Sequence, residues 1–171
     1  GKWVFKGFAD GDYKPIYGAE KLGDNQRPVL IVEGEKAKDY AEQHFSQIGQ
    51  EQIEVVSWLG GSAAAAKARW QLVAGREVII WPDNDEAGIK AANKVRQEIN
   101  RANGLLGLVR IIEPKEFNLP SGWDLADALP ADISKGQIVG KIEQVLTDIR
   151  AEIDLKGDKL AKIKDMVRLE H

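Results

Sequence analysis

Short hydrophobic runs alternate along the chain with longer segments in which apolar residues recur every three or four positions. The runs have the length and composition of buried strands; they lie at residues 29–32, 53–57, 78–81 and 108–112. The segments between them have the period of amphipathic helices and lie at residues 37–48, 63–72 and 88–102. Strands that alternate with helices of this length predict a parallel sheet with right-handed crossovers. We therefore predict an α/β fold with a central parallel sheet of about four strands, flanked by helices.

Local signals fix the ends of several predicted helices. Asp85 precedes the long helix, and Ser62 precedes the segment 63–72, which contains four consecutive alanines; both residue types are favoured helix N-caps. The pair Asn103-Gly104 predicts the end of the long helix. A short helical turn is expected at residues 122–129.

The two ends of the chain have different patterns from the middle. Aromatic residues around Asp10-Gly11 predict an N-terminal β-hairpin with arms at residues 2–6 and 13–17, and Pro15 makes the second arm an edge strand. Ser134 is expected to cap a C-terminal helix with an apolar stripe from Ile138 to Ile153, and residues 158–169 continue at helical spacing.

These patterns divide the chain into four parts. We expect a hairpin and linker at residues 1–27, a main domain at 28–130, a C-terminal helical extension at 131–168 and a tag remnant at 169–171. We also expect the chain to be a piece of a larger protein.

Composition excludes several classes of chemistry. The chain of 171 residues contains no cysteine and only two histidines, so a disulfide framework, a thiol nucleophile or a zinc site with cysteine ligands is not possible within it. The net charge of −3 argues against a basic protein that coats nucleic acid unaided. No apolar run is long enough to span a membrane. We therefore expect a cytoplasmic protein without a membrane partner.

Acidic residues follow two of the predicted strands directly. Glu33 ends the first run, and Asp83 and Asp85 follow the run Val78–Trp81. Ligands bind open α/β sheets at the carboxyl ends of their strands, and carboxylates gathered there are relieved most simply by a divalent cation such as Mg²⁺ or Mn²⁺. An Asp-x-Asp pair alone is usually a solvated turn or a cap. Its place directly after a buried strand, together with Glu33, is more specific.

Two sequence motifs resemble those of the Toprim domain. They are Ile31-Val-Glu-Gly-Glu-Lys36 and, fifty residues later, Asp83-Asn-Asp-Glu-Ala-Gly88. The Toprim domain is shared by bacterial-type primases, topoisomerases, nucleases of the OLD family and recombination mediators. The Gly60-Gly61-Ser62 turn and the segment Trp123-Asp-Leu-Ala-Asp127 resemble the primases of phages, plasmids and other mobile elements. The resemblance covers residues 28–130 and implies a Toprim (Rossmann-like) fold.

The resemblance also implies roles for individual residues. Glu33 corresponds to a general acid or base linked to the metal, Asp83 and Asp85 to paired metal ligands, and Asp124 to a further acid near the metals. These acids make up the expected catalytic and metal site, with Mg²⁺ or Mn²⁺ as cofactor. Nucleotide and phosphate contacts are expected from three glycines that allow close approach of the backbone and from two nearby lysines, namely Gly34, Gly60, Gly61, Lys36 and Lys90.

The function implied is that of the catalytic Toprim domain of a DNA primase, which makes RNA primers on single-stranded DNA. Its partners would be the template strand, nucleoside triphosphates, and a helicase or other domains of the same polypeptide. Two alternatives stay open: a nuclease of the OLD type that uses the same acids to activate water, and a Toprim-like module that binds nucleic acid or protein without catalysis. A topoisomerase would need a tyrosine nucleophile, and the hairpin and helix positions of Tyr13, Tyr17 and Tyr40 explain these residues more simply.

Overall fold

A five-stranded sheet forms the centre of the protein. The structure, a computed structural model, describes residues 13–103 and 108–169, with side chains described continuously as far as Lys159. The strand order is β1-β5-β2-β6-β7. The strands β5 (Glu54–Trp58), β2 (Val29–Glu33), β6 (Val78–Trp81) and β7 (Val109–Ile111) are parallel, and β1 (Ile16–Tyr17) pairs antiparallel with β5 at one edge. The predicted α/β class and its four parallel strands are thereby confirmed.

Alternate residues of each strand face two separate hydrophobic cores, as the two-residue period of a strand requires. In β2, Leu30 and Val32 belong to one cluster, whereas Val29 and Ile31 belong to the other. All four are at most 1% exposed. The strands are therefore buried on both faces, which explains their nearly continuous apolar sequences.

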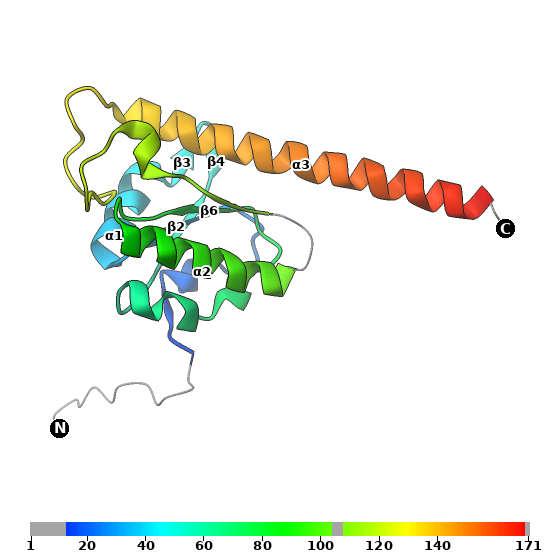
Figure 1. Ribbon diagram of the computed structural model, residues 1–171, viewed down its shortest axis with the longest axis horizontal. Helices are drawn as coiled ribbons and strands as arrows, with labels where there is room; N and C mark the ends of the chain where they lie inside the picture. Colours follow the sequence, from blue (N-terminus) through cyan, green and yellow to red (C-terminus); the bar gives the residue numbers. More distant parts are fainter. Residues whose placement is uncertain (1–12, 104–107, 170–171) are drawn as a thin grey trace.

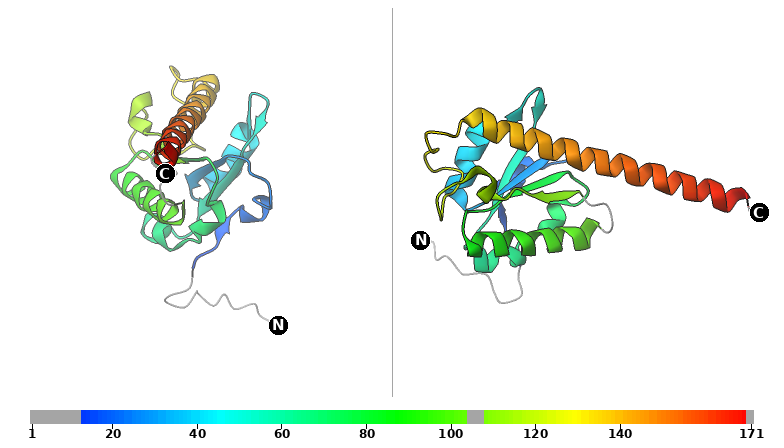
Figure 2. Two further views of the ribbon diagram at one scale, coloured as in Figure 1. Left: turned by 90° about the vertical axis from the view of Figure 1, so that its right-hand side faces the viewer. Right: turned by 45° about the horizontal axis from the view of Figure 1, so that its top comes forward.

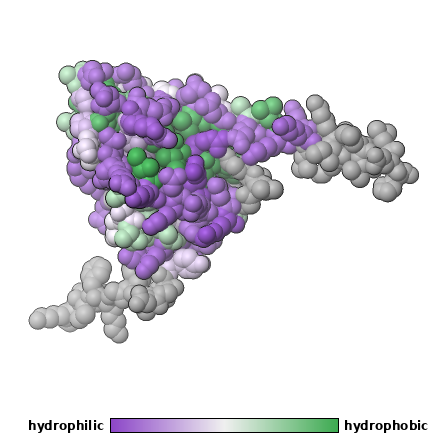
Figure 3. Space-filling view, viewed as in Figure 1, coloured by the Kyte–Doolittle hydropathy of each residue, from purple (hydrophilic) through white to green (hydrophobic). Residues whose placement is uncertain are grey.

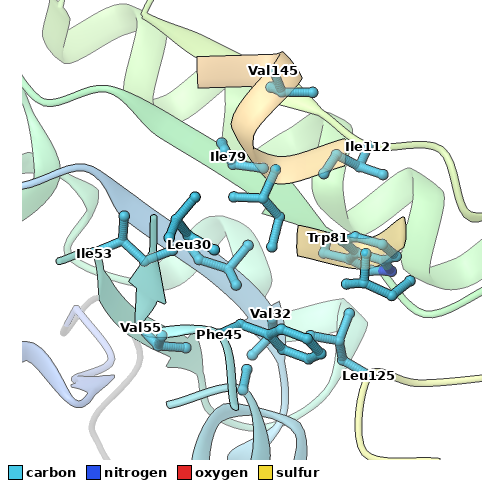
Figure 4. Close-up of a cluster of buried hydrophobic side chains, with 14 of the residues drawn as sticks. Leu30, Val32, Phe45, Ile53, Val55, Ile79, Trp81, Ile112, Leu125 and Val145 are labelled. Carbon is cyan, nitrogen blue, oxygen red and sulfur yellow. The ribbon is translucent and has the colours of Figure 1, made fainter. Parts of the chain in front are cut away.

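Helices cover both faces of the sheet (Figure 1). The helices α1 (Glu35–Phe45) and α3 (Lys135–Leu169) cover one face, whereas α2 (Glu86–Asn103) covers the other together with the 3₁₀ helices η2 (Ser62–Lys67) and η3 (Trp70–Val73). Figure 4 shows the first core, in which Leu30, Ile79 and Trp81 from the sheet meet Phe45 of α1 and Val145 of α3.

The shorter elements lie at the ends of the sheet. The 3₁₀ helix η1 (Ala19–Lys21) follows β1, and η4 (Pro114–Phe117) follows β7. The strands β3 (Gln47–Ile48) and β4 (Glu51–Gln52) form a separate two-stranded hairpin after α1.

The C-terminal helix is one continuous helix of 35 residues. Ser134 caps it as predicted: the Gln137 N–H donates to Ser134 Oγ (3.3 Å), and the Ser134 N–H donates to Gln137 Oε1 (2.7 Å), which is a capping box. The first half of α3 packs on the sheet through Ile138, Ile142 and Ile149. The second half extends beyond the sheet, so the C-terminus lies far from the body of the protein (Figure 2).

The prediction of a single helix over residues 63–72 was wrong. Two 3₁₀ helices occupy this segment, separated by Ala68 in extended conformation (ψ 157°). The break arises because the Lys14 N–H donates to the Lys67 carbonyl and the Arg69 N–H donates to the Lys14 carbonyl, which draws Ala68 into a β-bridge. The predicted Ser62 cap was also wrong, since Gly61 is the N-cap residue and no side chain caps η2.

The second arm of the predicted N-terminal hairpin is present as β1, an edge strand, whereas the first arm lies outside the described residues. The linker that follows is tied to the domain by Arg76, a buried cation with 5% exposure. Its guanidinium donates hydrogen bonds to the carbonyls of Leu22 (2.7 Å), Gly23 (3.1 Å) and Arg27 (3.3 Å). Arg76 thus holds a segment that sequence patterning predicted only as a surface loop.

Most of the face seen in Figure 3 is hydrophilic, with a hydrophobic strip across its middle. Among the helices that the structure describes, none combines the length and apolar character needed to cross a membrane.

Candidate active site

Two acids that follow neighbouring strands lie at the carboxyl edge of the sheet. Glu33 is the last residue of β2 and lies opposite Trp58 at the end of β5. Its neighbour Val32 lies opposite Trp81, the last residue of β6, and Asp83 comes two residues later. Parallel pairing in this register therefore brings Glu33 and Asp83 to the same edge, as expected from the sequence.

Asp85 has a structural role at this edge. The Gly88 N–H donates to Asp85 Oδ1 (2.6 Å), so Asp85 caps α2 as predicted. Gly88 packs directly on the Asp83 backbone: a Cβ atom at Gly88 would lie 2.7 Å from the Asp83 carbonyl oxygen. The absence of a side chain at Gly88 allows the start of α2 to lie against the loop that carries Asp83.

Asn84 joins this loop to residues 119–123, a segment much later in the chain. Its side-chain amide donates to the carbonyls of Leu119 (2.7 Å) and Pro120 (2.8 Å). Its backbone N–H donates to the Trp123 carbonyl (2.9 Å), and its carbonyl accepts from the Gly122 N–H (2.8 Å). Sequence reasoning missed this role, for which the only signal was an amide between two acids in a turn.

The segment held by Asn84 carries Asp124 and Asp127. The two acids lie on a single turn, closed by the Asp127 N–H donating to the Asp124 carbonyl (3.0 Å), and the short helix predicted here is not formed. The turn is favoured because the Asp127 and Asp124 side chains accept the N–H groups of Asp124 (3.0 Å) and Ala126 (2.6 Å). Lys36, in the first turn of α1, reaches across to Asp124 Oδ2 (3.4 Å) and Asp127 Oδ1 (3.2 Å).

The acids at the edge raise one another's proton affinity. Burial, together with the negative charges of Glu33, Asp124 and Asp85, raises the pKa of Asp83 to about 7. Burial and the charge of Asp85 raise the pKa of Glu33. The pKa of Asp127 is lowered, because its carboxylate accepts the Asp124 backbone N–H and pairs with Lys36. Glu33 and Asp83 are therefore the two acids of the site whose charged forms are disfavoured by their surroundings.

The donor set at this edge fits a metal ion that keeps most of its water. Glu33 Oε2 is buried and has no hydrogen-bond partner, and an unpartnered buried carboxylate oxygen is costly unless a cation or proton satisfies it. Within the part of the chain that the structure describes, no three acid or histidine side chains are grouped closely enough to hold a metal by themselves. Mg²⁺ needs only one or two protein carboxylates besides water and substrate phosphate. Glu33 and Asp83 could supply them.

The other residues expected to contact nucleotide or phosphate are placed differently. Gly34 (φ 81°) and Gly61 (φ 69°) have left-handed backbone conformations and open space where a Cβ would project, so a ligand could approach the backbone at both. Gly60 (φ 88°) faces the Lys14 side chain. Lys90 forms a salt bridge with Glu86 on the exposed surface of α2, so its ammonium group lies along the surface of its own helix.

The raised pKa of Asp83 predicts a pH-dependent stability in metal-free protein. Between about pH 4 and pH 7 the folded state retains a proton that the unfolded chain loses, so the free energy of unfolding falls as the pH rises through this range. Asp83→Asn should remove this fall in the free energy of unfolding. At pH 8 we expect the variant to be more stable than wild type by about 1–3 kcal/mol, a value discounted for partial solvent screening, with little difference at pH 4.

Denaturant unfolding in EDTA at pH 4, 6 and 8 measures this effect. Asp132→Asn, an exposed aspartate outside the site, is the matched control and should give a difference that does not vary in this way with pH. A difference between Asp83→Asn and wild type that is constant from pH 4 to pH 8 would contradict the assignment of the raised pKa to Asp83.

Comparison with known families agrees with this arrangement. The family model of the Toprim domain matches residues 28–114, which is half of the chain, and the chain belongs to this family. Toprim domains occur in metal-dependent enzymes that process nucleic acids, among them primases, topoisomerases and nucleases, and they bind divalent metals such as Mg²⁺ through acidic residues. Searches among curated proteins and among solved structures gave no significant match.

Proposed function

We propose that this chain is the catalytic Toprim domain of a DNA primase of the type found in phages, plasmids and other mobile elements. It would join ribonucleotides into primers on a single-stranded DNA template, as part of a larger protein with a helicase or other domains. The observation that carries the proposal is the docking of residues 119–123 on the Asp83 loop through Asn84. This docking places the segment that resembles primases, Trp123 to Asp127, beside Glu33 and Asp83.

The residues at the edge support a nucleotidyl transfer. The 3′-hydroxyl oxygen of one nucleotide attacks the α-phosphorus of the next, a new P–O bond forms, and pyrophosphate leaves with the electrons of the broken bond. Glu33, whose pKa is raised and whose Oε2 has no partner, is suited to take the proton of the attacking hydroxyl. Glu33 and Asp83, with Asp85 and Asp124 nearby, would hold a divalent metal, which would stabilise negative charge on the phosphoryl oxygens when bound.

The test is a comparison of wild type with the double variant Asp83→Asn/Asp85→Asn. Asparagine retains the cap of α2, so the variant loses charge without losing the helix start. We expect Mg²⁺ and Mn²⁺ titration by calorimetry to show binding to wild type and none to the variant. Only wild type should make primers from ribonucleoside triphosphates on single-stranded DNA. Asp132→Asn/Asp148→Asn is the control, with the same change in charge outside the site.

Two other outcomes would replace the proposal. Metal-dependent cleavage of DNA without added nucleotides would identify a nuclease that uses the same acids. Equal metal titration curves for wild type and the double variant, with neither synthesis nor cleavage, would identify a non-catalytic interaction module.

A further inference from the structure

A shallow groove with basic and exposed apolar side chains lies beside β1, away from the acids. Its volume is about 320 Å³, and its lining includes Tyr13, Lys14, Arg69 and Leu72. Tyr13 is 60% exposed and Leu72 is 44% exposed, two of the few large apolar side chains in the described residues that face solvent. Lys67 lies beside the groove, because its carbonyl accepts the Lys14 N–H. We call these five residues the basic groove.

Among the described residues, no acidic side chain pairs with the cations of the basic groove. In the described part of the chain, Lys14, Lys67 and Arg69 form no side-chain hydrogen bond or salt bridge, and no acidic residue lines the groove. Other lysines contact acids: Lys21 and Lys38, for example, both contact Glu42. In a chain with a net charge of −3, three unpaired cations at one place form a local positive surface that can attract an anion.

Backbone hydrogen bonds hold the residues that carry these cations next to one another. The hydrogen bonds of Lys14 with Lys67 (2.8 Å) and Arg69 (3.3 Å) form the β-bridge at Ala68. Ala68 is 2% exposed, so the side chains on either side of it, Lys67 and Arg69, point to solvent as alternate residues of an extended segment. The same bridge that ends η2 therefore presents two cations that are separated by one residue, Ala68.

Lys14 extends the basic groove towards the acids. A Cβ atom at Gly60 would lie 2.8 Å from Lys14 Nζ, so the ammonium group lies over the Gly60-Gly61 turn. This turn follows Trp58, which lies opposite Glu33 in the sheet. The cations thus continue from the outer side of η2 to the carboxyl edge that carries the candidate active site.

We infer that the basic groove binds single-stranded nucleic acid and directs it to the acids at the edge of the sheet. Phosphates would contact Lys14, Lys67 and Arg69, and a base would stack on Tyr13, which is the combination that single-strand binding surfaces use. The inference rests on the proposed function for the kind of ligand, since that function requires a single-stranded template. It adds a surface formed by residues outside the acidic motifs.

Binding of a fluorescent oligothymidylate, followed by anisotropy in EDTA without nucleotides, tests the inference. For Lys14→Gln/Lys67→Gln/Arg69→Gln we expect at least a tenfold rise in Kd. We also expect a fall of about 2 in the slope of log Kd against log salt, since each phosphate contact on a single strand contributes about 0.7. The control is Lys115→Gln/Lys141→Gln/Lys156→Gln, with the same change in net charge on the opposite face.

Tyr13 provides an independent test that does not alter charge. Tyr13→Ala should raise Kd about tenfold through loss of stacking, and Tyr13→Phe should bind as wild type does. If the triple variant fails to fold by circular dichroism, Lys67→Gln/Arg69→Gln, in which only exposed side chains change, replaces it, with an expected fall in slope of about 1.4.

Three results would overturn the inference. They are equal binding by the triple variant and its control at every salt concentration, no effect of Tyr13→Ala, and equally strong competition by polyglutamate, which would indicate a surface for acidic protein. Because this assay needs neither metal nor catalysis, it can support the inference about the basic groove even where primer synthesis fails. Conversely, if the triple variant makes primers and binds the oligonucleotide with undiminished affinity, the proposed function stands and the inference about the basic groove is wrong.

Discussion

Replacing Glu33 by glutamine is expected to lower the rate of metal-dependent nucleotidyl transfer by about 10²- to 10⁴-fold, the usual contribution of a positioned general base. The substitution keeps the shape of the side chain and removes its ability to accept a proton. Because Glu33 Oε2 is buried without a partner, loss of the charge should leave the protein as stable as wild type or more stable. Single-turnover kinetics with saturating metal would measure the rate of the chemical step.

Glu35→Gln is the matched control for this prediction, since Glu35 is exposed in the first turn of α1 and lies two residues from Glu33. It should retain the wild-type rate. The pH dependence gives a second readout: the rise in rate with pH that reflects deprotonation of a general base should be present in wild type and absent in Glu33→Gln. A rate within tenfold of wild type, with an unchanged pH profile, would mean that Glu33 is not the base.

Gly88→Ala is expected to disrupt the site without altering any acid. The added Cβ would lie 2.7 Å from the Asp83 carbonyl oxygen and 3.1 Å from its nitrogen, both backbone atoms that cannot rotate away. The start of α2 and the Asp83 loop must therefore separate. We expect a loss of about 1–3 kcal/mol in the free energy of unfolding, as for other overpacked positions, and at least tenfold weaker binding of Mg²⁺.

The control for Gly88→Ala is the same substitution at Gly140, a helical glycine in α3 where a Cβ would meet nothing within 4 Å. There alanine should stabilise the protein by up to about 1 kcal/mol, because it lowers the conformational entropy of the unfolded chain. Denaturant unfolding and metal calorimetry on both variants make the comparison. If Gly88→Ala behaves as Gly140→Ala does, the close contact does not constrain the Asp83 loop.

Sequence patterning predicted the elements that local residues determine. The four parallel strands follow from continuous apolar runs, and the caps at Asp85 and Ser134 follow from residue type, with Gln137 completing the second. The meeting of Glu33 and Asp83 required only that their strands be parallel neighbours.

Features that depend on distant partners could not be predicted in this way. The segment 63–72 has a helical composition, yet hydrogen bonds with Lys14 interrupt it at Ala68. Docking of residues 119–123 depends on Asn84 meeting carbonyl groups 35 and 36 positions away. Backbone carbonyls leave no trace in the residue pattern, so the sequence could not show which groups the Asn84 amide would meet.

The contacts of α3 have a consequence for what counts as the domain. The family match ends at residue 114, but the core on one face of the sheet is completed by Ile138, Ile142 and Ile149, each fully buried. This helix packs on β6 and β7, so buried apolar surface of these strands, to which Ile79 and Trp81 belong, would be uncovered without it. The stretch of sequence that defines the family and the stretch that must fold cooperatively are therefore different lengths of chain.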